Sequence, residues 1–405
     1  MKPIALSDGI FWIGVNDTTT QLFEGLWSIE KEGISYNSYL IKDEKNTLID
    51  LCKDSTGALL MENIKTCIDP HQLTYLVVNH MEPDHSGAIK ELLKIAPQIT
   101  ILGSEKTRDM LAAFFGINDH FQIVSDGETL SLGSHSLRFF STPMVHWPET
   151  IMTYEETSRI LFSCDGFGGY GKLEHGIFDD EQPNLGYFEK EALRYFSNIV
   201  CAFSKPVLKA AEKIATLKVN MVAPSHGLVW RSNPTRILQL YIDWSGYAGG
   251  NYPKKICLLH ASMYGNTGKI VPVVEKMLQD AGLEFESLDV TLTHISSVLP
   301  ALWTSAGVVI CAPTYEGALF PTMEFALEMA DKKHMTNKKA IYIGSYGWGG
   351  GAMRFINKQC EVLAWDLLGK VEFKGQATKT DIQQMRELTT GLVKSLQTNS
   401  KIDAA

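Results

Sequence analysis

The pattern of strands and helices changes abruptly near residue 250, and this change most limits the folds open to the chain of 405 residues. Before it, short apolar runs and helical patterns follow one another without regular alternation. After it, strand-like and helix-like segments alternate over residues 256–396. The stretch 245–255 between them is rich in Gly and polar residues, as linkers are. The sequence therefore predicts two domains, covering residues 1–250 and 254–400.

In the first half, predicted strands and helices are mixed without regular alternation. This order suits an α+β sandwich of sheets flanked by helices. Apolar runs bounded by turn signals predict strands over residues 37–51, 73–78, 99–102, 137–140, 151–154, 160–163 and 219–223. Helical periodicity predicts helices over residues 87–95, 106–115, 189–203 and 206–216.

The second half has the order of an α/β domain with a doubly wound parallel sheet. Its expected strands cover residues 256–260, 284–289, 307–311, 339–344 and 370–373. The expected helices between and after them cover residues 267–279, 322–329, 351–368 and 380–396.

Four side chains able to bind metal stand in one short run after an apolar strand: His80, Glu82, Asp84 and His85. Two carboxylates this close repel each other unless a cation neutralises them, so the run predicts a metal site. The mixture of oxygen and nitrogen donors favours more than one ion. We expect Pro83 to keep the run out of a helix, and Ser86 to cap a helix that begins at Gly87.

Three further candidate ligands lie downstream, each after an apparent strand: His146, Asp165 and His226. The ends of strands in one sheet deliver side chains to a common place, so these residues are expected to complete the metal site. Taken singly, each of them is more often an ordinary core or surface residue. The pattern of seven is far more specific than any one of its members.

Three loops after strands of the second half predict a nucleotide site at the carboxyl ends of a parallel sheet. The first lacks both G-x-G-x-x-G and the P-loop lysine, which favours a mononucleotide monophosphate over NAD or ATP. Aromatic rings in the other two suit the isoalloxazine of FMN, although ordinary βα turns are the alternative. The candidate residues are Ser262, Met263, Tyr264, Gly265, Asn266 and Thr267, then Pro313, Thr314, Tyr315 and Gly317, then Ser345, Tyr346, Gly347, Trp348, Gly349 and Gly350.

The ligand run resembles the metallo-β-lactamase signature H-x-H-x-D-H followed by His, Asp and His, with Glu82 in place of the second histidine. A carboxylate is a harder, more anionic ligand than imidazole and moves the preference from zinc toward iron. The resemblance implies an αββα sandwich. It places His80, Glu82 and His146 on one iron and Asp84, His85 and His226 on the other, with Asp165 bridging them. In relatives, the residue at the position of His85 can turn away from the metal.

The loop at residues 262–267 resembles the flavodoxin phosphate loop T-x-T-G-N-T, with Ser262 and Tyr264 replacing two threonines. Joined to the first resemblance, it makes the chain similar to the flavodiiron proteins. That family implies reduction of O2 to water, of NO to N2O, or of both, at two irons supplied with electrons through FMN. It also implies a rubredoxin or another small electron carrier as donor, and a head-to-tail homodimer or a tetramer. Trp147 is expected to shield the metal pocket.

Composition narrows the remaining alternatives. A net charge of −9 argues against nucleic acid as a partner, and no run of about 18 apolar residues predicts a membrane span. Seven cysteines without a C-x-x-C pair exclude a rubredoxin module and favour a reducing compartment, hence the cytoplasm. A zinc hydrolase fused to a flavodoxin and an electron carrier with a vestigial metal fold stay open. The sequence does not decide between O2 and NO.

Overall fold

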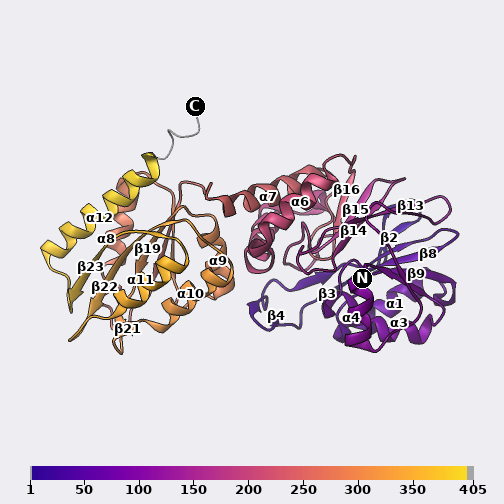
Figure 1. The fold of residues 1–405 in the computed structure, drawn as a ribbon, viewed down its shortest axis with the longest axis horizontal. Coiled ribbons are helices and arrows are strands. Elements are labelled where there is room, and N and C mark those ends of the chain that lie inside the picture. The colour runs from indigo at the N-terminus through magenta and orange to yellow at the C-terminus, as the bar shows by residue number, and fades with distance from the viewer. Residues whose placement is uncertain (1, 399–405) are drawn as a thin grey trace. The chain divides into compact units, whose positions relative to one another are not determined.

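The computed structural model describes residues 2–398, which form two compact units divided between Ser245 and Gly246 (Figure 1). We call residues 2–245 the front unit and residues 246–398 the rear unit, and describe each by itself. Within the described residues, no helix is both long and apolar enough to cross a membrane.

Two sheets form the centre of the front unit. The first has the order β1 (Ile4–Ser7), β2 (Ile10–Trp12), β7 (Tyr39–Ile41), β8 (Asn46–Ile49), β9 (Leu73–Val77), β10 (Thr100–Gly103) and β11 (Phe121–Ile123). The second has the order β12 (Thr129–Ser131), β13 (Ser136–Ser141), β14 (Ile151–Glu155), β15 (Ile160–Cys164) and β16 (Met221–Pro224). Two short ribbons pair β3 (Val15–Asp17) with β6 (Ile34–Tyr36) and β4 (Leu22–Phe23) with β5 (Trp27–Ser28).

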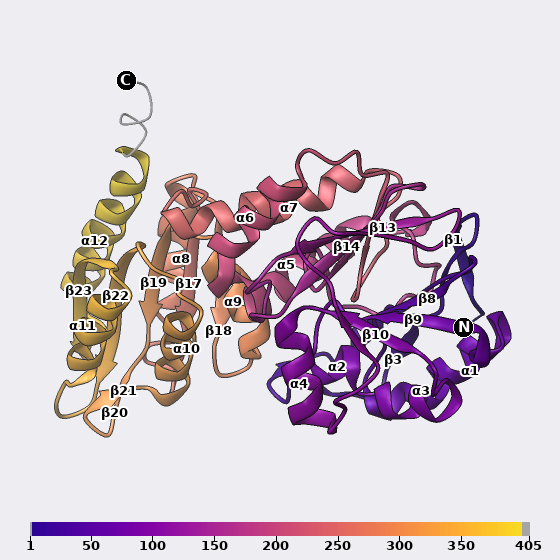
Figure 2. The same ribbon diagram turned by 45° about the vertical axis from the view of Figure 1, so that its right-hand side comes forward.

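Helices cover the outer face of each sheet, as Figure 2 shows, which confirms the predicted αββα sandwich. One layer holds α1 (Gly57–Cys67), α3 (Ile89–Ile95) and α4 (Glu105–Phe115). The other holds α5 (Leu185–Tyr195), α6 (Ser204–Ile214) and α7 (Pro234–Gly246). The predicted helix over residues 189–203 is α-helical to Tyr195 and continues as a π turn, Phe196–Val200, and a 3₁₀ turn, Cys201–Phe203.

Parallel pairing explains why residues distant in the sequence meet at one edge. Strands β8, β9 and β10 run parallel in the first sheet, and β15 and β16 run parallel in the second. The candidate ligands follow the carboxyl ends of β9, β15 and β16, except His146, which lies in the loop after β13. The predicted strand over residues 37–51 is two strands, β7 and β8, joined by a turn.

The local prediction around the ligand run was wrong in two respects. Pro83 does not prevent a helix, because it begins the short helix α2 (Pro83–Ser86), where the missing N–H of proline costs nothing. Ser86 does not cap the next helix. Its hydroxyl donates instead to the carbonyls of Met81 and Glu82, and α3 begins at Ile89.

The rear unit contains the predicted parallel sheet, in the order β18 (Phe285–Asp289), β17 (Ile256–His260), β19 (Gly307–Cys311), β22 (Lys339–Tyr346) and β23 (Asp366–Lys374). This 2-1-3-4-5 order is that of flavodoxin-like sheets and places the topological switch point between β17 and β19. The helices are α8 (Val271–Asp280), α9 (Ile295–Trp303), α10 (Pro321–Lys332), α11 (Ala352–Val362) and α12 (Lys379–Thr398).

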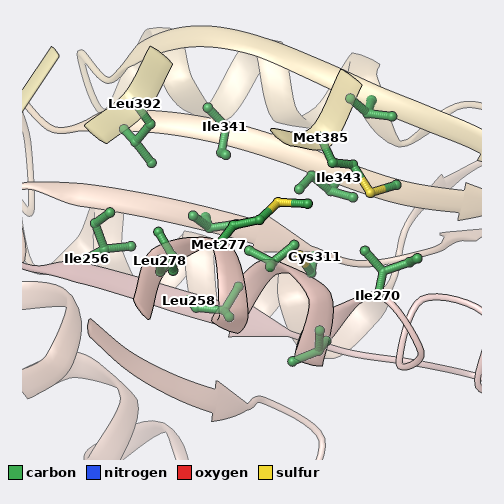
Figure 3. Packing of buried hydrophobic residues seen from close by; sticks show 14 of the residues in the cluster. Ile256, Leu258, Ile270, Met277, Leu278, Cys311, Ile341, Ile343, Met385 and Leu392 are labelled. Atoms are coloured by element: carbon green, nitrogen blue, oxygen red, sulfur yellow. The ribbon is translucent and has the colours of Figure 1, made fainter. Parts of the chain in front are cut away.

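One side of this sheet is buried by α8 and α12 (Figure 3). Ile256 and Leu258 of β17 and Ile341 and Ile343 of β22 point the same way because alternate residues of a strand share a face. Side chains from the two helices pack on them, including Met277, Leu278, Met385 and Leu392. The resulting core holds the strand ends, and therefore the candidate loops, in fixed positions.

Two boundaries in the rear unit differ from prediction. The helix expected over residues 351–368 ends at Val362, and β23 already begins at Asp366. The helix expected from residue 267 begins at Val271, because residues 266–270 form turns.

Candidate metal centre and cofactor loops

The structure brings all seven candidate metal ligands of the front unit into one cluster. Their donor atoms fall into two main groups, each with all atoms within 4.8 Å of one another. One group contains His80, Glu82, His146 and Asp165, and the other contains Asp84, His85 and His226. Asp165 also contacts the second group, since its Oδ1 lies 3.0 Å from His85 Nε2 and 3.3 Å from His226 Nε2.

Each of the four histidines directs Nε2 toward two carboxylates. His146 Nε2 lies 3.1 Å from Glu82 Oε2 and 3.2 Å from Asp165 Oδ2. His80 Nε2 lies 3.3 Å from the same two oxygens. Neighbouring ligands on one ion, with bonds of about 2.1 Å at right angles, stand about 3 Å apart. The observed spacing therefore fits donors that share a central ion.

The cluster also contains buried polar atoms that no other part of the described chain satisfies. Both carboxylate oxygens of Asp84 and of Asp165, both ring nitrogens of His85 and Nε2 of His226 have no aligned hydrogen-bond partner there. Buried polar atoms without partners are costly. Metal coordination would satisfy both oxygens of Asp165, one oxygen of Asp84 and Nε2 of His85 and of His226. The donor set of imidazoles and carboxylates suits iron, so the residues fit a pair of iron ions.

When no metal is bound, electrostatic attraction between the histidines and the carboxylates stabilises the cluster. Burial would raise the pKa of Asp165, but the charge of His85 and the close contacts of His146 and His226 hold that pKa well below its usual range. Burial would lower the pKa of His226, but the carboxylates of Asp165 and Asp84 raise it to about 10. The site therefore attracts positive charge strongly, which protons supply when metal does not.

A buried aspartate that the sequence analysis missed connects two of the ligand loops. Asp50 directly follows β8 and accepts hydrogen bonds from Asn79 N at 2.7 Å and Asn79 Nδ2 at 2.9 Å. Its other contact is Ser225 Oγ at 3.3 Å. Asn79 precedes His80 and Ser225 precedes His226, so one carboxylate fixes the backbone beneath both histidines. The only available signal was an acidic residue directly after an apolar strand.

Further contacts determine which ring nitrogen carries the proton in two of the histidines. His80 Nδ1 lies 2.6 Å from Glu149 Oε1, and His226 Nδ1 lies 2.8 Å from the carbonyl oxygen of Ser35. Each contact holds a proton on Nδ1 and leaves Nε2 free for a metal. Glu149 was also missed, although it follows His146-Trp147-Pro148 directly in the sequence.

Aromatic rings enclose the histidines. The rings of Phe23, Tyr36 and Tyr195 lie 5.5 to 5.6 Å from that of His226, and the ring of Trp147 lies 5.0 Å from that of His80. A pocket of about 230 Å³ reaches Glu82 and Asp84 from the surface. Its other lining residues are Thr20, Leu22, Phe23, Glu24, Gly25, Tyr36, Lys53 and Pro83.

The three predicted loops of the rear unit meet around a second pocket, of about 250 Å³. Eleven of the predicted residues line it: Ser262, Met263, Tyr264, Asn266, Thr267, Pro313, Thr314, Ser345, Tyr346, Gly347 and Trp348. Gly375, which the sequence analysis missed, also lines it. The predicted residues Gly265, Tyr315, Gly317, Gly349 and Gly350 are not among its lining residues.

The first loop lines this pocket and contains backbone donors without acceptors. Ser262 Oγ accepts hydrogen bonds from the backbone N–H groups of Gly265 and Gly268, which closes the loop. Among the described residues, the N–H groups at positions 263, 264, 266 and 267 have no acceptor. Four free N–H groups in one turn form a nest for an anion, so the loop fits a phosphate. The Thr267 hydroxyl pairs with that of Ser345 at 2.8 Å and links two loops.

Comparisons with known proteins identify the family of this chain. Residues 34–227 match the family model described as ODP family beta lactamase. The chain is 30% identical to a nitric oxide reductase of Moorella thermoacetica, over 91% of this chain and 92% of that protein. It is 31% identical to the anaerobic nitric oxide reductase flavorubredoxin of Shigella flexneri, over 95% of this chain and 80% of that protein. The chain belongs to the flavodiiron protein family.

Solved structures of flavodiiron proteins have the same fold. Rubredoxin oxygen:oxidoreductase from Desulfovibrio gigas superposes with a TM-score of 0.92 at 26% identity, covering 98% of this chain and 99% of that one. The flavodiiron protein from Giardia intestinalis gives a TM-score of 0.92 at 27% identity, covering 98% and 97%. The predicted family and the predicted fold class are therefore confirmed.

Proposed function

We propose that this flavodiiron protein reduces O2 to water, NO to N2O, or both, at two irons held by the front unit, with electrons arriving through FMN in the rear unit. The observation that carries the proposal is the cluster of seven donor side chains with its buried, unpartnered atoms. Family membership supports this function over a zinc hydrolase fused to a flavodoxin. Glu82 supports it independently, because a carboxylate at that position favours iron.

The irons would supply binding and reduction of the diatomic gas, and the protein supplies their environment. His80, Glu82 and His146 would hold one iron, and Asp84, His85 and His226 the other. Asp165 would touch both. The three carboxylates bring three negative charges against the four positive charges of two ferrous ions, which leaves a nearly neutral buried site.

The surrounding residues position these ligands and border the pocket that leads to them. Hydrogen bonds from His80 to Glu149 and from His226 to Ser35 hold a proton on Nδ1 and aim Nε2 of both rings inward, where a metal would take the place of its proton. The rings of Phe23, Tyr36 and Trp147 occupy the space beside the histidines, which limits access to the pocket that reaches Glu82 and Asp84.

The rear unit would hold FMN by its phosphate in the loop that follows β17. The free N–H groups at positions 263, 264, 266 and 267 support this, together with the exposed rings of Tyr264 and Trp348 beside the same pocket. As in the sequence-based expectation, we assign the diiron domain to residues 1–250 and the FMN domain to residues 254–400.

For the electron donor we propose rubredoxin or a similar small carrier, since one relative is named rubredoxin oxygen:oxidoreductase. We also propose a head-to-tail homodimer or a tetramer, as expected for the family, and the cytoplasm as the location. All seven cysteines are free thiols, which suits a reducing compartment.

The deciding experiment is anaerobic. The protein is reduced by a rubredoxin system, and consumption of O2 and of NO is compared with that of a Glu82→Ala variant. We expect the variant to lose activity toward both gases while its flavin absorbance stays unchanged. Glu24→Gln is the matched control, because Glu24 lines the same pocket but belongs to neither donor group. Normal turnover of both gases by Glu82→Ala would refute the iron assignment.

A further inference from the structure

Glu149 occupies an unusual position for a charged residue. It lies in the turn before β14, and only 1% of its surface is exposed. Its Oε1 accepts hydrogen bonds from His80 Nδ1 at 2.6 Å and from Met81 N at 2.9 Å. Among the described residues no lysine or arginine pairs with it, and its Oε2 has no partner. A buried carboxylate without a cationic partner lowers stability. Its contact with His80 therefore indicates a role in holding that ring.

The two histidines of the second group lack such support. His226 Nδ1 faces a neutral backbone carbonyl, that of Ser35, at 2.8 Å. His85 Nδ1 is buried, and no partner for it lies within the described part of the chain. The first group therefore contains a histidine anchored by an anion, whereas the histidines of the second group have one neutral anchor or none.

This difference has a chemical consequence for metal binding. A carboxylate on Nδ1 makes the imidazole a more basic ligand and fixes its orientation, and loss of such a partner typically weakens metal affinity about 10- to 100-fold. A carbonyl dipole does this less, because it carries no net charge. A histidine without a partner on Nδ1 must also lose rotational freedom when it binds.

From this asymmetry we propose that Glu149 is a positioning residue that makes the two ion positions unequal, so that the ion held by His80, Glu82 and His146 binds more tightly than the ion held by Asp84, His85 and His226. The proposal rests on the proposed diiron function. It predicts an order: the first position fills first and empties last.

The test measures iron release rather than turnover. Full-length protein carrying two irons per chain is mixed anaerobically with a ferrous chelator, and the coloured complex is followed over time. We expect two phases of about one iron each. Glu149→Gln keeps a hydrogen-bond acceptor but removes the charge, and it should accelerate the slow phase about 10- to 100-fold while leaving the fast phase unchanged. Glu149→Asp keeps the charge, so the rate of its slow phase should lie between those of the wild type and of Glu149→Gln.

The chain offers a matched control in a second buried pair. Glu155 is fully buried, and its Oε1 lies 3.0 Å from His135 Nδ1, yet neither residue belongs to a donor group. Glu155→Gln therefore removes the same charge from the same kind of contact and should leave both phases unchanged. Equal acceleration by Glu155→Gln would show general loosening of the fold and would overturn the proposal.

A second measurement needs no change at Glu149. With one iron per chain, the affinity for this first equivalent should be the same in wild type and in His85→Asn, because the first ion would not use His85. A weaker first equivalent in His85→Asn, or a single release phase in the wild type, would overturn the inference but leave the diiron function intact. Protein that binds no iron after anaerobic reconstitution would instead refute the function itself.

Discussion

The front and rear units prepare their sites in different ways. In the front unit His80 and His226 have no exposed surface, and donor atoms already contact one another. In the rear unit the rings beside the pocket stand in solvent, with Tyr264 88% and Trp348 91% exposed. A buried ion needs its ligands fixed in advance, because unpaired charges in the interior are costly. A flat organic cofactor instead brings its own apolar surface and can cover exposed rings when it binds.

Removal of the shared carboxylate should give the largest effect and should act on the front unit alone. Asp165 contacts all four histidines at 3.0 to 3.3 Å. In Asp165→Asn the charge that holds both groups together is lost. We expect iron affinity to fall more than about 100-fold, with flavin content unchanged. Elemental analysis and the flavin spectrum measure the two sites separately.

Asp179→Asn is the matched control for this prediction. Asp179 is also a buried carboxylate of the front unit, but it binds Ser232 and backbone N–H groups rather than the histidines. We expect it to lower stability while leaving the iron content near two per chain. Loss of flavin from Asp165→Asn would break the contrast between the units, since it would show that the two sites depend on each other.

The second prediction concerns pH in the metal-free protein. Burial would lower the pKa of His146, but the carboxylates of Asp165 and Glu82 raise it to about 9, and that of His226 is raised to about 10. These raised values stabilise the folded state fully below about pH 6.5, the usual histidine pKa, and the stabilisation is lost as pH rises through 9 and 10. Each group loses at most about 1.4 kcal/mol per pH unit.

Calorimetry of chelated protein between pH 6.5 and 10 tests this. The unfolding midpoint of the front unit should fall as pH rises, whereas the midpoint of iron-loaded protein should not follow that trend, because metal replaces the protons. The rear unit serves as an internal reference with no comparable cluster among its described residues. A metal-free front unit that becomes more stable toward pH 10 would contradict the charge balance described here.

The site residues that the sequence predicted correctly lie in loops that follow predicted strands. The candidate ligands follow β9, β13, β15 and β16, and the cofactor loops follow β17, β19 and β22, so a correct list of strands was enough to bring them together. Most of these strands are short runs of mainly apolar residues, a pattern that is consistent with buried strands. The family resemblance added the division of the ligands between two ions.

The part that sequence did not predict depends on long-range contacts. Asp50 bonds Asn79 and Ser225, which are 29 and 175 residues away, and Glu149 bonds His80 across 69 residues. In the sequence, a single acidic residue gives no indication of which distant residue it will contact. The boundary at Val362 was missed for another reason: β23 is an edge strand whose first half is partly exposed, so its apolar pattern is weak.

The smallest expected effect belongs to the exposed ring of the rear unit. Trp348 lines the second pocket and is 91% exposed, so its removal costs the fold little. Stacking on a flavin would bury it, and Trp348→Ala should therefore weaken FMN binding about 10-fold, or about 1.4 kcal/mol, without changing iron content. Titration of flavin-free protein by fluorescence measures this affinity.

Phe325→Ala is the matched control, because Phe325 is an exposed aromatic residue outside the pocket. If Trp348→Ala binds FMN as the wild type does, the exposed ring serves another surface, and the backbone nest after β17 must supply the affinity without it.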